Sequence, residues 1–491
     1  MSTCPTNNKN RSHLMSSTTL KRYSFHLPII MAIGQTVLST AQAQEIQFTP
    51  PSPLEVSRPL RPGPARWVED YRFLDNPAKR TDPFDALRFQ RLSDSAWLQT
   101  GAELRYRADA ADQPVFGLRG VKDDSYLMQR AQVHVDLHLL DDSLRTFIQL
   151  QNTRTWGKDL PSPSDQSRNE IQQAFIDGNL HYQSGTLTTR VGRQEMAYGN
   201  QVLVTYREIP NIRQSFDGVR LSWIAKDGYK LDAFATRPVV SRDNGSFNDT
   251  SNHQQKFYGL YGTLPLSSVL KADLYTFGLK TEQRKLDGFT GEDNRYTFGT
   301  RLFGTWNKFD WSWDLMKQVG HMASADIDAW AVSSDSGYTF AGPWKARLGL
   351  RVDAASGDKD GDHKAGTFDP LFPKNAFYGQ ASLTTLSNII LVGPTLRFSP
   401  FNRFRFEPGI FAAWRESNDD GVYLPGMTTA PGTTTSSGKR LGTLYQANAN
   451  WTPTANVSVD LDYVFYDIGS AIKSAGGNNS QILVLRSTFR F

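Results

Sequence analysis

Hydrophobic and polar residues alternate along most of the chain with a period of two. In residues 126–139, one face consists almost wholly of Leu127, Ala131, Val133, Val135, Leu137 and Leu139. The residues between them are mainly polar or charged. A helix would place apolar residues three and four positions apart, which this segment does not. The pattern therefore predicts a strand with one apolar and one polar face.

The same alternation recurs in further segments that together with the first make eighteen. They cover residues 97–107, 143–155, 169–181, 185–196, 213–225, 228–238, 254–264, 268–280, 294–306, 309–321, 327–341, 343–355, 386–399, 402–416, 440–452, 455–467 and 479–491. Most are long enough for a tilted strand to cross a bilayer. An even number also allows antiparallel closure with both ends on one side.

The connections between these segments alternate between short and long. Tight turns with turn-forming residues occur at 141–142, 183–184, 226–228, 265–266, 307–308, 342–343, 400–401 and 453–454. Between them lie mostly longer polar segments near 109–125, 157–168, 198–212, 240–253, 281–293, 322–326, 356–385, 417–439 and 469–478. This rhythm predicts an all-β, transmembrane, antiparallel up-and-down β-barrel with short periplasmic turns and long extracellular loops. A soluble β-sandwich is the alternative, but it gives no reason for the strict alternation.

The last predicted strand ends on aromatic residues. Phe489 and Phe491 close the chain, and such an ending resembles the assembly signal of bacterial outer-membrane barrels. We therefore expect the barrel-assembly machinery and outer-membrane lipids to be partners of this chain.

The first 43 residues have the features of a secretory signal peptide. Four cations and no acid precede or flank a short apolar stretch, and Ala41-Gln42-Ala43 stands before Gln44. We expect cleavage between Ala43 and Gln44, with translation starting at Met1 or Met15. Of the 54 basic residues, 50 then remain against 49 acidic ones. The basic balance thus gives no support for nucleic-acid binding, and the chain's one cysteine, Cys4, leaves with the leader.

Residues 44–95 do not follow the strand pattern. Six prolines lie between positions 50 and 64, and they indicate an extended linker. The following residues mix aromatic and charged side chains without a clear period. We predict a periplasmic extension over 44–95 and a barrel over 96–491.

The polar faces of the predicted strands carry many arginines. Inward positions are predicted for Arg105, Arg107, Arg130, Arg145, Arg190, Arg220, Arg301, Arg347, Arg351, Arg403, Arg405, Arg486 and Arg490. The acids of the same face include Glu103, Asp136, Asp177, Asp232, Asp273, Asp314, Asp353, Asp460 and Asp462. A ring of arginines would favour anions. The alternative is that the arginines only pair with these acids inside a wide lumen.

Six stretches, in order, resemble the alginate-export family of outer-membrane barrels, in the broad sense that includes members of unassigned substrate. They are Trp67–Tyr71, Asp124–Arg130, Val191–Glu195, Ser215–Arg220, Ser334–Phe340 and Gly366–Pro373. The resemblance implies an eighteen-stranded barrel with an arginine-rich pore for an anionic polysaccharide such as alginate. It is stronger to the wider branch than to the alginate exporters themselves.

Two other kinds of chemistry have weaker support. His134 and His138 share one face of a predicted strand, and Ser143 lies just beyond the following turn. An outer-membrane lipase or protease would need such groups close together, but no Gly-x-Ser-x-Gly element occurs. Asp358, Asp360 and Asp362 resemble part of a calcium loop, yet His363 stands where the loop needs glycine. We expect no cofactor and no catalytic site.

The sequence thus predicts an integral channel in the outer membrane of a Gram-negative bacterium. Its expected solute is anionic or polar, either a polysaccharide or a small organic acid. A generic non-selective porin and an outer-membrane barrel enzyme are the alternatives.

Overall fold

The computed structural model describes residues 62–286, 288–374 and 378–491. The expected signal peptide, its cleavage at Ala43 and Gln44, and most of the proline-rich linker lie outside the described residues.

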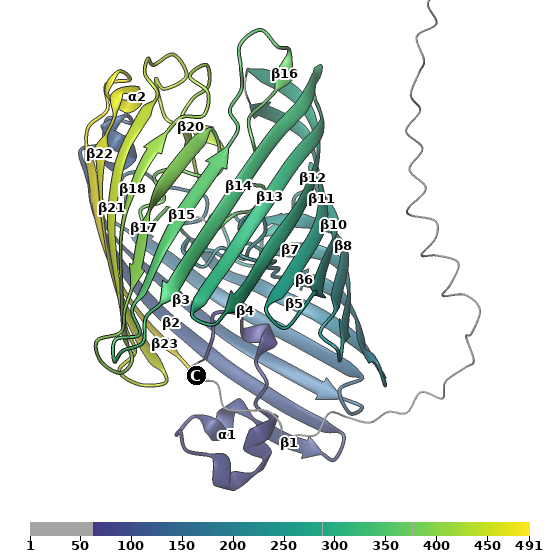
Figure 1. The fold of residues 1–491 in the computed structure, drawn as a ribbon. Helices are drawn as coiled ribbons and strands as arrows, with labels where there is room; N and C mark the ends of the chain where they lie inside the picture. The colour runs from purple at the N-terminus through teal and green to yellow at the C-terminus, as the bar shows by residue number, and fades with distance from the viewer. Residues whose placement is uncertain (1–61, 287, 375–377) are drawn as a thin grey trace, which may run out of the picture. The chain divides into compact units, whose positions relative to one another are not determined.

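Eighteen antiparallel strands form a closed barrel, as the alternation predicts (Figure 1). They are β2 (Ala96–Asp112), β3 (Asp123–Leu139), β4 (Leu144–Trp156), β5 (Ser167–Tyr182), β6 (Gly185–Gln194), β7 (Phe216–Ala225), β8 (Lys230–Val240), β10 (Gln255–Pro265), β11 (Leu270–Leu286), β12 (Phe289–Trp306), β13 (Phe309–Met322), β14 (Ala325–Thr339), β15 (Arg347–Ala355), β17 (Ile389–Arg397), β18 (Phe404–Trp414), β21 (Arg440–Trp451), β22 (Val457–Ile468) and β23 (Ser480–Arg490). The first and last strands pair from Glu103 opposite Arg490 to Asp112 opposite Gln481. This pairing leaves the barrel without a free edge.

One predicted loop is wrong. Residues 281–293 were expected to form a long polar connection, but β11 and β12 continue toward each other until Leu286 pairs with Phe289. Backbone pairing needs no apolar face once strands leave the membrane, so the alternation reveals only the part of a strand that contacts lipid. The described segments include no helix that is both long and apolar enough to cross a bilayer.

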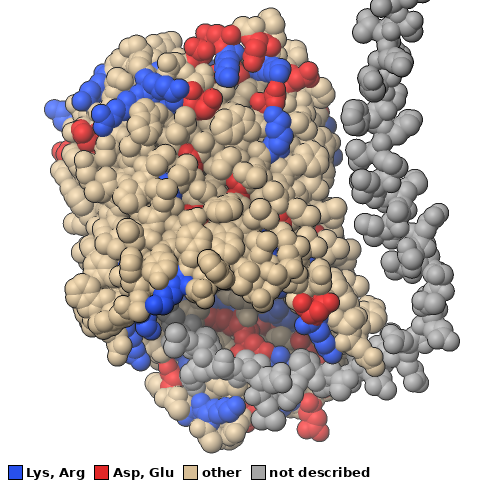
Figure 2. All heavy atoms as spheres, viewed as in Figure 1, with Lys and Arg blue, Asp and Glu red and all other residues tan. Residues whose placement is uncertain are grey.

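The outer surface of the barrel is apolar between two charged ends. On β3, Val133 and Val135 are 55% and 47% exposed, whereas their neighbours Gln132 and His134 are buried inside. Figure 2 shows a largely uncharged band between charged upper and lower rims. Such a band matches the hydrocarbon layer of a membrane. We call the rim with the tight turns and the carboxy-terminus the turn end, and the opposite rim the loop end.

Part of the interior is an apolar core, which the alternation did not predict. The β6–β7 loop (195–215) and the β15–β17 loop (356–388) meet in the lumen, where the Thr205 amide donates to the Phe372 carbonyl at 3.0 Å. These loops pack against aromatic side chains that point inward from β7, β8, β10 and β11. The wall residues are Phe216, Phe234, Phe257, Tyr261, Tyr275 and Phe277.

Short helices and strands lie at both ends of the barrel. The loop end carries η5 (Pro114–Gly117), β9 (Thr250–Ser251), β16 (Lys364–Ala365), β19 (Tyr423–Leu424), β20 (Thr428–Thr429) and α2 (Ser470–Lys473). Before the barrel come η2 (Arg66–Val68), η3 (Arg72–Asp75), η4 (Pro77–Lys79), α1 (Asp85–Arg88) and β1 (Gln90–Ser93).

This amino-terminal extension holds the carboxy-terminal residue. The Phe491 ring stacks on Phe84 with the centroids 4.8 Å apart. The amide and the carbonyl oxygen of Phe491 both bond to the backbone of Ala102 at 3.1 Å. Arg66 also donates to the same Phe491 oxygen at 2.5 Å. The role of Phe489 and Phe491 as an assembly signal stays a prediction.

Candidate functional site

The lumen is lined by arginines that are paired with carboxylates. The pairs on the wall are Arg107–Asp109 at 2.6 Å, Arg145–Asp136 at 2.7 Å, Arg190–Asp177 at 2.7 Å, Arg220–Asp232 at 2.6 Å, Arg301–Asp273 at 3.1 Å, Arg351–Asp353 at 2.6 Å, Arg405–Glu407 at 2.6 Å and Arg486–Asp460 at 3.2 Å. Arg347 contacts both Asp310 and Asp335. The pairing that the sequence left as an alternative is therefore widespread.

Two of the predicted side chains have different surroundings from those expected. Arg403 lies in the turn before β18, with a φ of 62°, and donates to the Pro453 carbonyl at 3.0 Å. It is exposed at the turn end and does not belong to the strand face. Asp462 faces the lumen, accepts a hydrogen bond from Asn448 at 2.5 Å and forms no ion pair with an arginine among the described residues.

Arg105, Arg130 and Arg490 hold a loop and do not line an open passage. All three contact Glu208 in the β6–β7 loop. Arg130 reaches its carboxylate at 2.8 Å, Arg490 at 3.0 Å, and Arg105 donates to its carbonyl at 2.7 Å. Arg213, from the same loop, donates to the Glu208 carboxylate at 2.7 Å.

Glu103 completes this buried network. Its carboxylate pairs with Arg130 at 2.7 Å and with Arg490 at 2.6 Å. Burial alone would raise the pKa of Glu208, but Arg130 and Arg213 outweigh it and lower that pKa to about 2. The network thus fixes a charged loop against the inner wall.

The sequence pattern did not identify Glu208, because an irregular loop has no period. It placed Arg213 in a predicted strand (213–225), whereas β7 begins only at Phe216. A usable signal was nevertheless present in the same segment. The run Val202–Val204 is apolar although it lies in a predicted surface loop, and all three residues are buried in the structure. Apolar residues in a long loop indicate that the loop folds inward.

The amino-terminal segment enters the lumen from the turn end and meets this loop. Arg145 donates to the Trp67 carbonyl at 2.7 Å, and Arg213 donates to the Pro64 carbonyl at 2.8 Å. The Trp67 ring contacts the Tyr206 ring edge to face, with centroids 5.4 Å apart. The lumen beside β2–β6 is therefore occupied by protein.

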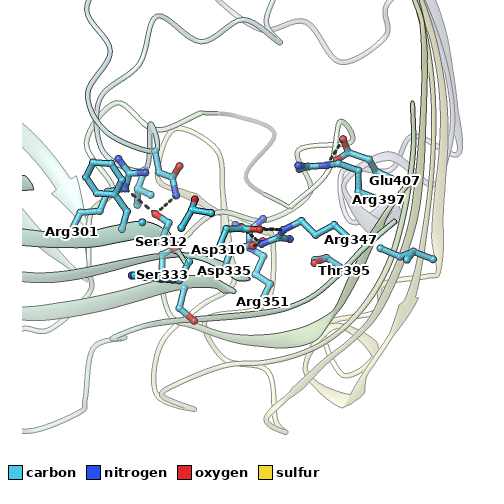
Figure 3. A pocket seen from close by; sticks show the side chains of 18 of the residues that line it. Arg301, Asp310, Ser312, Ser333, Asp335, Arg347, Arg351, Thr395, Arg397 and Glu407 are labelled. Atoms are coloured by element: carbon cyan, nitrogen blue, oxygen red, sulfur yellow. Dashed lines mark hydrogen bonds and ion pairs between the residues drawn. The ribbon is translucent and has the colours of Figure 1, made fainter. Parts of the chain in front are cut away.

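The other side of the lumen contains three neighbouring cavities. The largest of the three, about 750 Å³, lies near the turn end and is lined mainly by residues of β11–β15, β17 and β18, with others from the two infolded loops and β21 (Figure 3). A second of about 270 Å³ shares Arg351, Glu407 and Gln446 with the first. A third of about 280 Å³, at the loop end, shares Gln380 with the second. Because neighbouring cavities share wall residues, the three lie in a row, off-centre, from the turn end to the loop end.

Cations outnumber carboxylates on the wall of the largest cavity. Lys271, Arg301, Arg347, Arg351, Lys374 and Arg397 face three carboxylates, Asp310, Asp335 and Glu407. The partners of two arginines lie behind the wall. The side chains of Arg301 and Arg351 are 14% and 19% exposed, while those of Asp273 and Asp353 are 2% and 0% exposed. The guanidinium groups therefore reach the cavity while their counter-charges stay buried.

The histidines of the enzyme alternative have structural surroundings. His138 stacks on Trp97 at 4.7 Å and contacts Asp136 at 3.1 Å and Asp142 at 2.5 Å. His134 stacks on Phe147 at 5.4 Å. The buried Ser143 hydroxyl has no hydrogen-bond partner among the described residues. The three side chains thus do not form a nucleophile and its base.

Two carboxylates of the calcium-loop candidate bond to the backbone of their own loop. Asp358 accepts a hydrogen bond from the Gly366 amide at 2.8 Å, and Asp362 accepts one from the Lys364 amide at 2.9 Å. These carboxylates shape their own loop. Within the described ranges, no three His, Cys, Asp or Glu side chains are grouped closely enough to hold a metal ion.

Comparisons with known proteins agree with this architecture. The barrel superposes on crystal structures of Acinetobacter baumannii OccAB1 (TM-score 0.54, 11% identity, 80% of this chain and 96% of that one) and Pseudomonas aeruginosa OpdQ (0.53, 14%, 80% and 97%). It also superposes on the outer membrane protein opdK from Pseudomonas aeruginosa (0.52, 11%, 81% and 98%). At these identities the likeness concerns the fold, which is that of an outer-membrane porin. No curated protein matches the chain.

The family model for alginate export matches residues 96–485, which is nearly the whole barrel. The turn end is accordingly periplasmic and the loop end extracellular. The chain belongs to the alginate-export family and is a β-barrel of the outer membrane.

Proposed function

We propose that this protein is an outer-membrane channel that passes small anionic solutes along the off-centre cavities. The observation that carries the proposal is the excess of cations on the wall of the largest cavity. Arginine guanidinium groups hold carboxylates by paired hydrogen bonds, and rings of cations favour anions in a pore. A non-selective porin would not need an excess of cations on the wall of its passage.

The occupied half of the lumen favours a small solute over a long polymer. The β6–β7 loop and the segment around Trp67 fill one side, and the remaining cavities measure about 750, 270 and 280 Å³. A continuous polysaccharide would require these segments to be displaced. Cavities of these sizes favour a carboxylated solute of one or two rings.

Lys271 and Arg397 can be neutralised to test the proposal without breaking a buried ion pair. Lys271 is exposed in the cavity, and Arg397 shares Glu407 with Arg405, so Glu407 keeps a partner when Arg397 is lost. We expect the wild-type channel to be anion-selective in a potassium chloride gradient at low salt. Lys271→Gln combined with Arg397→Gln should lower the anion-to-cation permeability ratio by about twofold or more.

Reversal potentials in planar bilayers measure this ratio. The matched control is Lys226→Gln with Lys308→Gln, which removes the same charge from two turns at the periplasmic rim, outside the residues that line the cavity. The preference should also shrink at 1 M salt, where charges are screened within about 3 Å. Cation selectivity of the wild type at low salt would refute the proposal.

A further inference from the structure

The extracellular cavity differs in chemistry from the two cavities below it. Much of its wall is apolar, whereas the inner cavities are lined mainly by polar and charged side chains. The apolar lining includes Val115, Leu160, Ile209, Leu383, Leu424 and Ile482. These residues come from separate loops and strands, so the folded barrel assembles an apolar surface at the start of the route.

The charges on most of this wall are compensated within it. Arg107 makes two hydrogen bonds of 2.6 Å to Asp109, which also accepts one from the Tyr126 hydroxyl at 3.0 Å. Lys158 contacts Asp165 at 2.6 Å. Asp124 accepts from the backbone amides of residues 159 and 160. A solute would therefore have to compete with these partners.

Arg119 is the exception among the charged residues of this cavity. Its exposed side chain lines the cavity and makes no hydrogen bond or ion pair with any described residue. The loop that carries it is nevertheless anchored. Phe116 is fully buried against Tyr466, with ring centroids 5.2 Å apart, and its carbonyl accepts from the Asn478 amide at 2.9 Å. The Arg119 guanidinium, which has no partner among the described residues, thus lies in a cavity whose wall is largely apolar.

We propose that this cavity captures amphipathic monocarboxylates, with the carboxylate at Arg119 and an aromatic ring or short alkyl body against Leu160 and Leu424. The inference rests on the proposed channel function and narrows its substrate class. Sugar acids fit less well, because their hydroxyls would lose water against an apolar wall that offers few hydrogen bonds. The volume of about 280 Å³ suits a body of one ring, since sites for larger drug-sized ligands begin at about 300 Å³.

Benzoate, benzyl alcohol and glucuronate serve as probes that distinguish recognition of the carboxylate from recognition of the apolar body. Benzoate has the apolar ring and the carboxylate, benzyl alcohol has only the ring, and glucuronate has the carboxylate on a hydroxylated ring. Each is added on the extracellular side while transient block of single-channel current is recorded. We expect wild-type protein to bind benzoate about tenfold more tightly than either of the other two.

Two variants test the residues. Arg119→Gln should weaken block by benzoate and by glucuronate about fivefold, whereas Arg168→Gln, which removes an exposed arginine at the extracellular end of β5, should change neither. Leu160→Asn should narrow the preference for benzoate over glucuronate. Arg119 and Leu160 do not line the large periplasmic cavity, so their replacement leaves its wall unchanged.

Equal block by benzoate and glucuronate in the wild type would overturn the inference, even if anion selectivity in potassium chloride supports the channel proposal. Equal effects of Arg119→Gln and Arg168→Gln would overturn it as well. The wild-type comparison needs no variant to fold, so the inference is decided even if Arg119→Gln does not assemble.

Discussion

Replacing Glu208 by glutamine is expected to lower the free energy of unfolding by about 3 kcal/mol or more. Arg130 and Arg213 are completely buried beside this carboxylate, and Arg490 is nearly so. The neutral amide would leave Glu103 to balance most of the positive charge. Removing one partner from a buried ionic network costs more than the network gains on formation, because the remaining charges cannot return to water.

The unfolding temperature in detergent, followed by the shift in gel migration between folded and unfolded protein, measures the loss. Glu282→Gln is the matched control, because Glu282 is exposed at the loop end of β11. Equal unfolding temperatures for the two variants would contradict a stabilising role for the network.

The same carboxylate gives the wild type a defined pH dependence. Its pKa is about 2 in the folded barrel against an ordinary value of 4.5. A lowered pKa contributes stability that is fully present above pH 4.5 and is lost as the pH falls toward 2. We expect Glu208→Gln to lack this part of the acid sensitivity.

Replacing Trp67 by alanine is expected to release the amino-terminal segment from the lumen. The Trp67 side chain is 7% exposed and packs with Phe147, Phe175 and Tyr206. Truncation of a buried tryptophan costs about 3–5 kcal/mol, which exceeds what two backbone hydrogen bonds from Arg145 and Arg213 can compensate. The segment should then undock at the periplasmic mouth.

Limited trypsin digestion from the periplasmic side and single-channel conductance measure the release. Cleavage after Arg66 or Arg80 should become faster, and conductance should rise because one of the two segments that fill this half of the lumen leaves it. Val68→Ala serves as the control, since Val68 is 69% exposed. Unchanged digestion and conductance in Trp67→Ala would show that the segment is held by other contacts.

The fold could be predicted from the sequence because a membrane imposes its own pattern. Every strand must present an apolar face to lipid, so the period of two appears wherever the barrel crosses the bilayer. The same alternation predicted that Arg130 and Arg351 lie inside the barrel. The alternation shows which face of a strand a side chain occupies, but it does not show what fills the lumen beside that side chain.

The division of the lumen could not be predicted for that reason. Arg130 contacts Glu208 of an infolded loop, whereas Arg351 reaches an open cavity, although both stood on the polar face of their strands. The inward aromatic residues Phe234 and Tyr261 are likewise explained only by the loop that packs on them. Such contacts join residues far apart in sequence, where no short-range pattern exists.

Thiol modification at the cavity wall tests the off-centre route most directly, because Cys4 is the chain's one natural cysteine and belongs to the predicted leader. Thr395 lines the largest cavity, and Thr236 is buried on the side of the lumen that the β6–β7 loop covers. The route predicts that a negatively charged methanethiosulfonate reagent lowers the conductance of Thr395→Cys and leaves that of Thr236→Cys unchanged. Loss of conductance in Thr236→Cys, with Thr395→Cys unaffected, would place the passage on the other side of the lumen and contradict the account.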